Sequence, residues 1–247
     1  MSTPAFRDGR ATRVTDPATA DRVVIDPDAI ELFNWNIGKG GRAKWAAELA
    51  RLAGEADIVT LQEAPLSNPG WAAAKDERVH AFAPGYATRQ SSTGVMTVSA
   101  ARPLRQCNLS SREPLIRSPK ATLITEYALL GRDQTLLVVN IHAINFAPGL
   151  RAFERQLGMA ADVVARHDGP VIVAGDFNTW RPARQKHVDE RLDALELRPV
   201  AFAVDRRKRF FGQALDHVYV RGLYVVTATS YASRASDHNP MRVRLSM

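Results

Sequence analysis

The sequence has a single cysteine, and it lacks several short motifs that would place it in a common functional class. Cys107 alone excludes a disulfide within the chain and a zinc cluster built from cysteines. The six histidines form no His-x-x-His or His-x-x-x-His pair, which argues against other zinc sites. There is no Gly-x-Ser-x-Gly elbow, and Gly38-Lys39-Gly40-Gly41 lacks the spacing and the Ser/Thr of a phosphate-binding P-loop.

Long apolar segments are also missing from the start of the chain. Residues 1–29 mix acidic and basic side chains without an apolar core, so neither a signal peptide nor a membrane span is visible there. We therefore expect a cytoplasmic protein with no membrane span. Residues 1–29 are predicted to form a flexible N-terminal arm and residues 30–247 a single catalytic domain, since no low-complexity segment or short repeat interrupts them. No protein partner is indicated, and a monomer is expected.

The composition is that of a folded, basic protein. Hydrophobic residues make up 45% of the chain and charged residues 24%, which is ordinary for a soluble globular protein. The net charge is +7 and the pI about 9.9. This charge favours polyanionic partners such as nucleic acid or acidic headgroups.

Apolar runs and turn residues predict alternating groups of strands and helices. The stripe Trp45, Leu49 and Leu52 indicates a helix that ends near Gly54. Two further helices are predicted over 150–164 and around 188–195, and residues 66–85 are predicted to form a loop with one helical turn. Strands are predicted over 31–37, 57–63, 94–99, 121–129, 136–142, 171–176, 215–220 and 241–245. This order suggests two packed sheets covered by helices.

Polar residues of one chemical kind follow the predicted strands. The buried run 171–174 leads into Gly175, Asp176 and Asn178, and a strand that ends in this way delivers both polar groups to one side of an edge. Carboxylate and carboxamide oxygens are hard ligands suited to Mg²⁺, with Mn²⁺ as an alternative. The complete set is Asn36, Glu63, Asn140, His142, Asp176, Asn178, Asp216, Asp237 and His238.

Six segments in this order give the chain a family resemblance. They are Asn-Trp-Asn, Leu-Gln-Glu, Asn-Ile-His, Gly-Asp-Phe-Asn, Leu-Asp-His and Ser-Asp-His-Asn-Pro. Together they resemble the endonuclease/exonuclease/phosphatase superfamily, over about residues 31–247. The resemblance implies a deoxyribonuclease I-like four-layer α/β/β/α sandwich, in which helices flank two packed, mainly antiparallel sheets. It also implies divalent-metal-dependent hydrolysis of a phosphoester by a directly attacking water.

The resemblance also implies a role for each residue. Glu63, Asn36 and Asp237 match the metal site. Asp176 and Asn178 match the pair that positions the water and holds the phosphate, and His238 matches a histidine that Asp216 fixes. His142 matches a second histidine that donates to the phosphate or the leaving group, with Asn140 beside it as a substrate-binding residue. Either Asp176 or His238 is the general base.

Each residue taken singly also has a structural interpretation. Asn36 could cap a turn, and Glu63 could cap a helix. Asp176 and Asn178 could form an Asx-turn, and His142 could be a buried core histidine. Asp216 and His238 could be an isolated surface ion pair.

The identity of the substrate depends on weaker signals. A basic run precedes two phenylalanines; it consists of Arg206, Arg207, Lys208 and Arg209. This run either binds a polyanion or forms a solvated charged loop. The tyrosine and Asn-Pro-Asn-type residues of abasic-site endonucleases are missing. We expect a nuclease acting on DNA or RNA; the alternatives are a phosphoesterase for a phospholipid headgroup or small phosphoester, or a non-catalytic binding module.

Overall fold

The computed structural model describes residues 12–13, 24–68, 78–88 and 91–247. Most of the predicted N-terminal arm lies outside these residues. The described part contacts the domain: strand β1 (Thr12–Arg13) pairs with β6 (Arg105–Arg112), and the side chain of Ile25 is buried in the core. The division into an arm and one catalytic domain stays a prediction.

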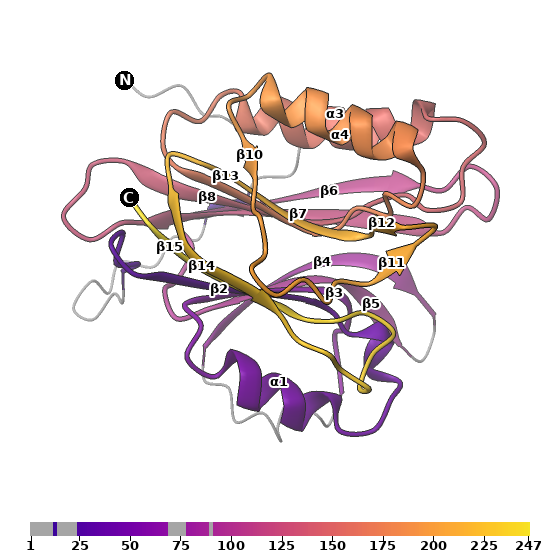
Figure 1. The fold of residues 1–247 in the computed structure, drawn as a ribbon, viewed down its shortest axis with the longest axis horizontal. Coiled ribbons are helices and arrows are strands. Elements are labelled where there is room, and N and C mark those ends of the chain that lie inside the picture. Colours follow the sequence, from indigo (N-terminus) through magenta and orange to yellow (C-terminus); the bar gives the residue numbers. More distant parts are fainter. Residues whose placement is uncertain (1–11, 14–23, 69–77, 89–90) are drawn as a thin grey trace.

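The strands form two large sheets (Figure 1). One sheet has seven strands, in the order β1, β6, β7 (Pro119–Ala128), β8 (Thr135–His142), β9 (Val171–Asp176), β13 (Asp216–Arg221) and β10 (Arg198–Pro199). The other has six, in the order β14 (Tyr224–Ser230), β15 (Met241–Ser246), β2 (Ile30–Asn36), β3 (Ile58–Pro65), β5 (Ser92–Ser99) and β4 (Val79–Ala87). β11 (Arg209–Phe210) and β12 (Gln213–Ala214) form a separate two-stranded ribbon.

Helices cover the outer faces of the two sheets (Figure 1). Helix α1 (Trp45–Ala53) packs on the six-stranded sheet, where Trp45, Leu49 and Leu52 join a cluster with β2, β3 and β5. Helices α3 (Arg151–Val164) and α4 (Pro182–Asp193) pack on the seven-stranded sheet. The predicted α/β/β/α sandwich is thus confirmed.

Only two strand pairs in these sheets are parallel, β2 with β3 and β8 with β9. Each pair is connected through a helix, as a parallel connection requires. The two parallel pairs bring Asn36 and Glu63 to the end of one sheet, and His142 and Asp176 to the end of the other. His142 is the register partner of Asp176, which is also the partner of Asp216 on β13.

Three parts of the element prediction are wrong or incomplete. Residues 79–85, predicted as part of a loop, belong to strand β4 (Val79–Ala87), because backbone pairing with β5 outweighs Pro84 and Gly85. Residues 69–77 of the predicted loop and helical turn lie outside the described residues. β6 and β14 had no predicted counterpart, since many of their residues are polar or exposed; β14 is an edge strand, and β6 has only the two-residue β1 on its outer side. Helix α4 ends before Leu195.

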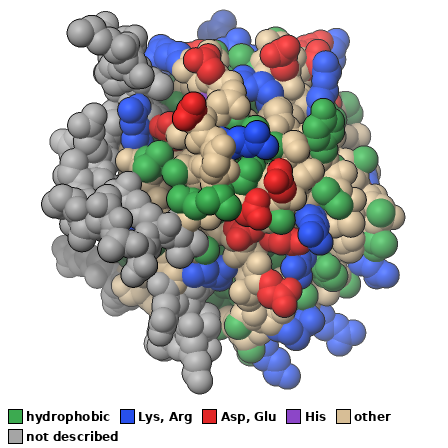
Figure 2. Space-filling view, turned by 90° about the vertical axis from the view of Figure 1, so that its left-hand side faces the viewer, with side chains coloured by type: hydrophobic (Ala, Val, Ile, Leu, Met, Phe, Trp, Pro, Cys, Tyr) green, Lys and Arg blue, Asp and Glu red, His purple; other side chains and the backbone are tan. Residues whose placement is uncertain are grey.

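Two further features concern the outside of the molecule. Among the described residues, no helix is both long and apolar enough to cross a membrane. Among the described residues on the face in Figure 2, which is the left-hand side of Figure 1, acidic and basic side chains are both present and interspersed.

Candidate active site

A pocket of about 700 Å³ opens at the edge of the sandwich where β11 and β12 lie (Figure 1). Both sheets contribute to it, because the polar ends of their strands meet at this edge. The predicted residues that line it are Glu63, His142, Asp176, Asn178, Lys208, Asp237 and His238. Asn36 and Asp216 lie directly behind the lining and bind to it. The structure thus brings together most of the predicted site.

The end of β9 is shaped by a close approach of two backbones. A Cβ atom at Gly175 would lie 2.0 Å from the carbonyl oxygen of Ile141, so only glycine fits before Asp176. Asn178 has a φ of 51°, and its backbone N–H donates to Oδ1 of Asp176 at 3.0 Å. The Asx-turn is therefore formed, and it holds the carboxylate of Asp176 toward the pocket.

Asp176 is the buried centre of the site. Its Oδ2 accepts a hydrogen bond from Nδ2 of Asn36 at 3.0 Å, and it lies 3.6 Å from Nε2 of His142 and 3.9 Å from Nε2 of His238. Burial raises the pKa of Asp176, and the charge of His238 opposes this shift. Two histidines and one amide therefore converge on a single carboxylate oxygen.

Glu63 reaches the pocket through a bulge in β3. The register with β5 shifts between Leu61 and Ala64, and Glu63 has a φ of 51°. Its carboxylate lies 3.8 Å from Nε2 of His142, with 27% of the side chain exposed. Burial raises the pKa of Glu63, and the charges of Lys120 and Lys39 oppose the shift. A strained backbone at this point aims the carboxylate into the pocket.

His238 is held by a carboxylate behind it. Its Nδ1 donates to Oδ2 of Asp216 at 2.8 Å, and its backbone carbonyl accepts from the indole N–H of Trp35 at 2.9 Å. Burial by itself lowers the pKa of His238, but the charges of Asp216 and Asp176 outweigh burial and raise it to about 10. His238 is thus a cation at neutral pH in the absence of metal.

The site has donors that fit a divalent cation. Ligand atoms of Asp176, Asp216 and His238 lie within 4.8 Å of one another. Oδ1 of Asp216 is buried and has no hydrogen-bond partner among the described residues, which fits an atom able to bind a cation. Glu63 and Asp237 present further carboxylates to the pocket. Asn36, also predicted as a metal ligand, uses both ends of its amide in hydrogen bonds within the protein. Its Oδ1 accepts the backbone N–H of Gly38 at 3.1 Å, and its Nδ2 donates to Asp176.

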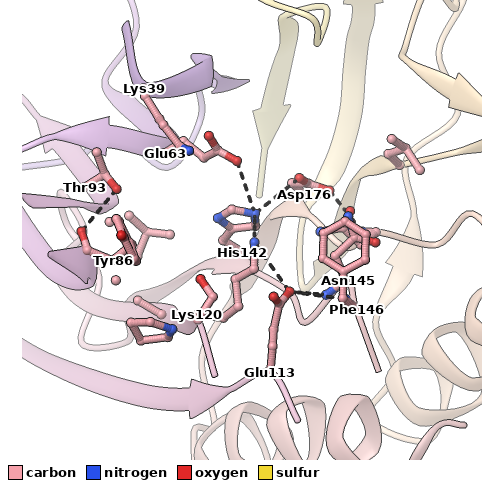
Figure 3. A pocket seen from close by; sticks show the side chains of 18 of the residues that line it. Lys39, Glu63, Tyr86, Thr93, Glu113, Lys120, His142, Asn145, Phe146 and Asp176 are labelled. Carbon is pink, nitrogen blue, oxygen red and sulfur yellow. Dashed lines mark hydrogen bonds and ion pairs between the residues drawn. The ribbon is translucent and has the colours of Figure 1, made fainter. Parts of the chain in front are cut away.

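His142 has a positively charged neighbour, Lys120 (Figure 3). The ammonium Nζ of Lys120 donates to Nε2 of His142 at 2.8 Å, and it lies 3.9 Å from Oε1 of Glu113. Burial and the charge of Lys120 hold the pKa of His142 well below its ordinary value of 6.5. His142 is therefore neutral, and in this arrangement its Nε2 accepts a hydrogen bond and does not donate one. The predicted role of His142 as a donor to the phosphate does not fit this geometry.

Asn140 is not part of the pocket. Its side chain is fully buried between the sheets, where Nδ2 donates to the carbonyls of Met96 at 2.9 Å and Leu61 at 3.2 Å. Its Oδ1 accepts from Nε2 of Gln62 at 2.8 Å. Because its hydrogen bonds are used inside the protein, Asn140 is not available to a substrate. The prediction of a substrate-binding Asn140 is corrected: it ties β8 to the opposite sheet.

The four basic residues 206–209 have different surroundings in the folded protein. Arg207 and Arg209 both bind the carboxylate of Asp205, at 2.8 and 2.7 Å, and Arg207 also donates to the backbone carbonyl of Asp216. Only Lys208 lines the pocket, next to Phe210. Arg206 is exposed and lies outside the lining. The three arginines were predicted to bind substrate, but in this structure they do not line the pocket.

Sequence reasoning did not identify Lys120, Lys39 or Glu113. Lys120 lies one residue before the predicted strand 121–129, and nothing in the local pattern separates it from other surface lysines. Its position beside His142 depends on the register between β7 and β8, in which Thr122 faces Ile141. Only the pairing of strands reveals it.

Comparisons with known proteins agree with this geometry. Residues 33–238 match the profile of the Endonuclease/Exonuclease/phosphatase family. The chain is 40% identical over 220 residues to a UPF0294 protein of Klebsiella pneumoniae (strain 342), which covers 89% of this chain and 83% of that protein.

Solved structures share the fold at low identity. The catalytic domain of human Nocturnin, with a bound sulfate anion, has a TM-score of 0.67 and 17% identity, covering 92% of this chain and 97% of that chain. A mannosyl-6-phosphatase of Bacteroides thetaiotaomicron has a TM-score of 0.66 and 13% identity, covering 88% and 100%. The profile match spans most of the chain and includes every pocket carboxylate. This protein therefore belongs to the endonuclease/exonuclease/phosphatase family and is a metal-dependent phosphoric ester hydrolase.

Proposed function

We propose that this enzyme is a magnesium-dependent nuclease that hydrolyses phosphodiester bonds of DNA or RNA. The observation that carries the proposal is the composition of the pocket wall. Lys39, Lys120 and Lys208 surround the carboxylate and histidine centre, and Tyr86, Phe146 and Phe210 line the same pocket. Lysines bind a phosphate backbone, and aromatic side chains stack on unpaired bases. The net charge of +7 supports a polyanionic substrate.

In the proposed mechanism, Glu63, Asp237, Asp216 and Asp176 are the candidates to hold a divalent cation, which neutralises charge on the phosphate when bound. Asp176, fixed by Asn36 and by the backbone of Asn178, orients the attacking water. His238, which Asp216 holds as a cation in the metal-free protein, would donate a hydrogen bond to a phosphate oxygen. Asp176 would accept a proton from the water as its oxygen bonds to phosphorus, while the bond from phosphorus to the leaving oxygen breaks and that oxygen takes a proton from solvent.

A phospholipid headgroup is the second candidate substrate, because of one apolar loop. Leu115 and Ile116, between β6 and β7, have exposed fractions of 67% and 59%, and Ile116 lines the pocket. Exposed aliphatic side chains beside an active site suit contact with a lipid surface. A single-stranded nucleic acid is favoured because three lysines line the same pocket.

A substrate panel tests the proposal. Plasmid, single-stranded DNA, RNA and sphingomyelin vesicles are incubated with the enzyme, with Mg²⁺ or with EDTA, and Asp176→Asn serves as the inactive control. We expect Mg²⁺-dependent cleavage of nucleic acid that EDTA and the substitution abolish. Cleavage of sphingomyelin alone would replace the proposal with the second candidate.

A further inference from the structure

Lys120 is a largely buried cation in the wall of the pocket, and the proposed mechanism assigns it no role. Only 13% of its side chain is exposed, and it lines the pocket from the second residue of β7. Keeping an ammonium this enclosed costs solvation free energy, which requires compensating partners. A lysine at such a position therefore has either a structural or a ligand-binding reason to be there.

The two partners of Lys120 hold its ammonium from one side. Nε2 of His142 accepts from Nζ at 2.8 Å, and Oε1 of Glu113 lies 3.9 Å away (Figure 3). Glu113 is itself fixed, because the backbone N–H groups of Asn145 and Phe146 donate to its Oε1 at 2.9 and 3.3 Å. An ammonium has three N–H donors, and among the described residues only the contact with His142 is within hydrogen-bond distance, because Oε1 of Glu113 at 3.9 Å is an ion-pair partner only. Donors are therefore left for a ligand oxygen in the pocket.

A merely structural role explains this arrangement less well. The carboxylate of Glu113 already accepts two backbone N–H groups, so it does not need the lysine for hydrogen bonding. The same Nε2 of His142 that accepts from Lys120 lies 3.6 Å from Oδ2 of Asp176 and 3.8 Å from Oε1 of Glu63, so the ammonium and both carboxylates gather around one nitrogen atom. The ammonium therefore lies on the side of the ring that faces the proposed reaction centre.

We propose that Lys120 binds a non-bridging oxygen of the substrate phosphate, and that His142 is a positioning residue that holds the ammonium there. The inference rests on the proposed function only in requiring a phosphoester substrate. It applies equally to a nucleic acid, a phospholipid or a synthetic diester. It also explains why the second histidine of the site faces a lysine.

Kinetics with bis(4-nitrophenyl) phosphate and Mg²⁺ test the contact. Lys120→Met keeps the length of the side chain and removes its charge, and we expect kcat/KM to fall about 100-fold. Lys120→Arg keeps a cation and should restore most of that loss. Lys186→Met is the matched control, because Lys186 is 76% exposed on α4, and its kcat/KM should equal that of the wild type. Equal losses in Lys120→Met and Lys120→Arg would overturn the proposal.

A double-variant cycle tests the positioning role of His142. If His142 acts through Lys120, then His142→Ala combined with Lys120→Met should be no slower than Lys120→Met alone. Multiplied losses would assign His142 a separate role and overturn this part of the proposal. Thermal unfolding of each variant identifies any that fail to fold, and for those Lys120→Gln replaces Lys120→Met.

Binding of inorganic phosphate separates this inference from the proposed function. Calorimetry with Mg²⁺ should show phosphate affinity about tenfold weaker in Lys120→Met than in the wild type, and unchanged in Lys186→Met. If the wild type cleaves no nucleic acid but phosphate affinity depends on Lys120, the proposed substrate is wrong and the inference holds. Unchanged affinity in Lys120→Met overturns the inference even if the enzyme is a nuclease.

Discussion

His238 and His142 approach the same carboxylate oxygen from similar distances, yet their other neighbours have opposite charges. Nε2 of His238 lies 3.9 Å from Oδ2 of Asp176, and Nε2 of His142 lies 3.6 Å from it. Asp216 stands behind His238 and Lys120 beside His142. One ring is therefore a cation and the other neutral, although both are buried. The comparison teaches that the partner of a histidine, more than its burial, decides what it can do in this pocket.

The largest expected effect comes from removing the carboxylate that both histidines face. Asp176→Asn should lower kcat about 10³-fold, because the proposed base and the water-orienting charge are lost together. Bis(4-nitrophenyl) phosphate hydrolysis measures the loss, and Asp162→Asn on exposed α3 is the control, with unchanged turnover expected. Turnover of Asp176→Asn near the wild-type rate would remove Asp176 from the reaction.

The next test changes only the carboxylate that binds His238, and it leaves the neighbours of His142 in place. Asp216→Asn should lower kcat/KM about 100-fold, since His238 loses both its charge partner and its fixed orientation. It should also lower the pKa of His238 from about 10, which an NMR titration in EDTA follows. An unchanged pKa would show that Asp216 does not set the charge of this ring.

The same pKa predicts a pH dependence of stability in the metal-free protein. The pKa of folded His238, about 10, exceeds its ordinary value of 6.5, so the folded state binds the proton more tightly. This contribution is complete below pH 6.5 and is lost as the pH rises toward 10. Urea unfolding in EDTA across this range should show a decline that is shallower in Asp216→Asn. Parallel curves for the two proteins would contradict the assignment.

A structural test concerns the strand that carries His142. Asn140→Ala should lower the free energy of unfolding by about 2–4 kcal/mol, because buried carbonyls of Leu61 and Met96 and the amide of Gln62 lose their partner. Its kcat should fall by less than about tenfold, since Asn140 lies outside the pocket. A large loss of kcat without loss of stability would restore Asn140 as a substrate-binding residue.

The smallest expected effect is on the charge state of His142 itself. Lys120→Met should raise the pKa of His142, because one of its two main depressing causes is removed. Burial, the larger cause, remains, so the ring should stay neutral at neutral pH. NMR titration of His142 in EDTA, with Lys186→Met as control, measures the change. A further decrease of the pKa would contradict the assigned influence of the lysine.

Most of the fold follows from local patterns. Buried apolar runs mark the central strands, and the stripe of Trp45, Leu49 and Leu52 marks α1, because burial on one face leaves a periodic signal. Edge strands leave a weaker periodic signal in the sequence. β14 exposes Tyr224, Val225 and Val226, and its buried residues, Ala228 and Ser230, are too small and too few to give an apolar pattern.

The site was predictable where a residue belongs to a motif at a strand end. Glu63, His142 and Asp176 lie at strand ends that parallel pairing brings to one edge, and Asn178 follows directly. His238 lies in the segment before β15, which pairs antiparallel with β2. Asn140 could not be assigned in this way. It shares a strand face with His142, but a shared face does not tell which residue reaches the pocket and which stays between the sheets.

The amino-acid sequence by itself determined the family, the layered architecture and the chemistry, because motifs and apolar periodicity are properties of neighbouring residues. Tertiary structure alone decided the charge of each histidine and the availability of each basic side chain. Lys120 reaches His142 through the register of β7 and β8, and Asp205 engages Arg207 and Arg209 while Lys208 faces the pocket. Electrostatic interactions depend on distance in space, and residues far apart in the sequence come within a few ångströms only once the sheets have packed.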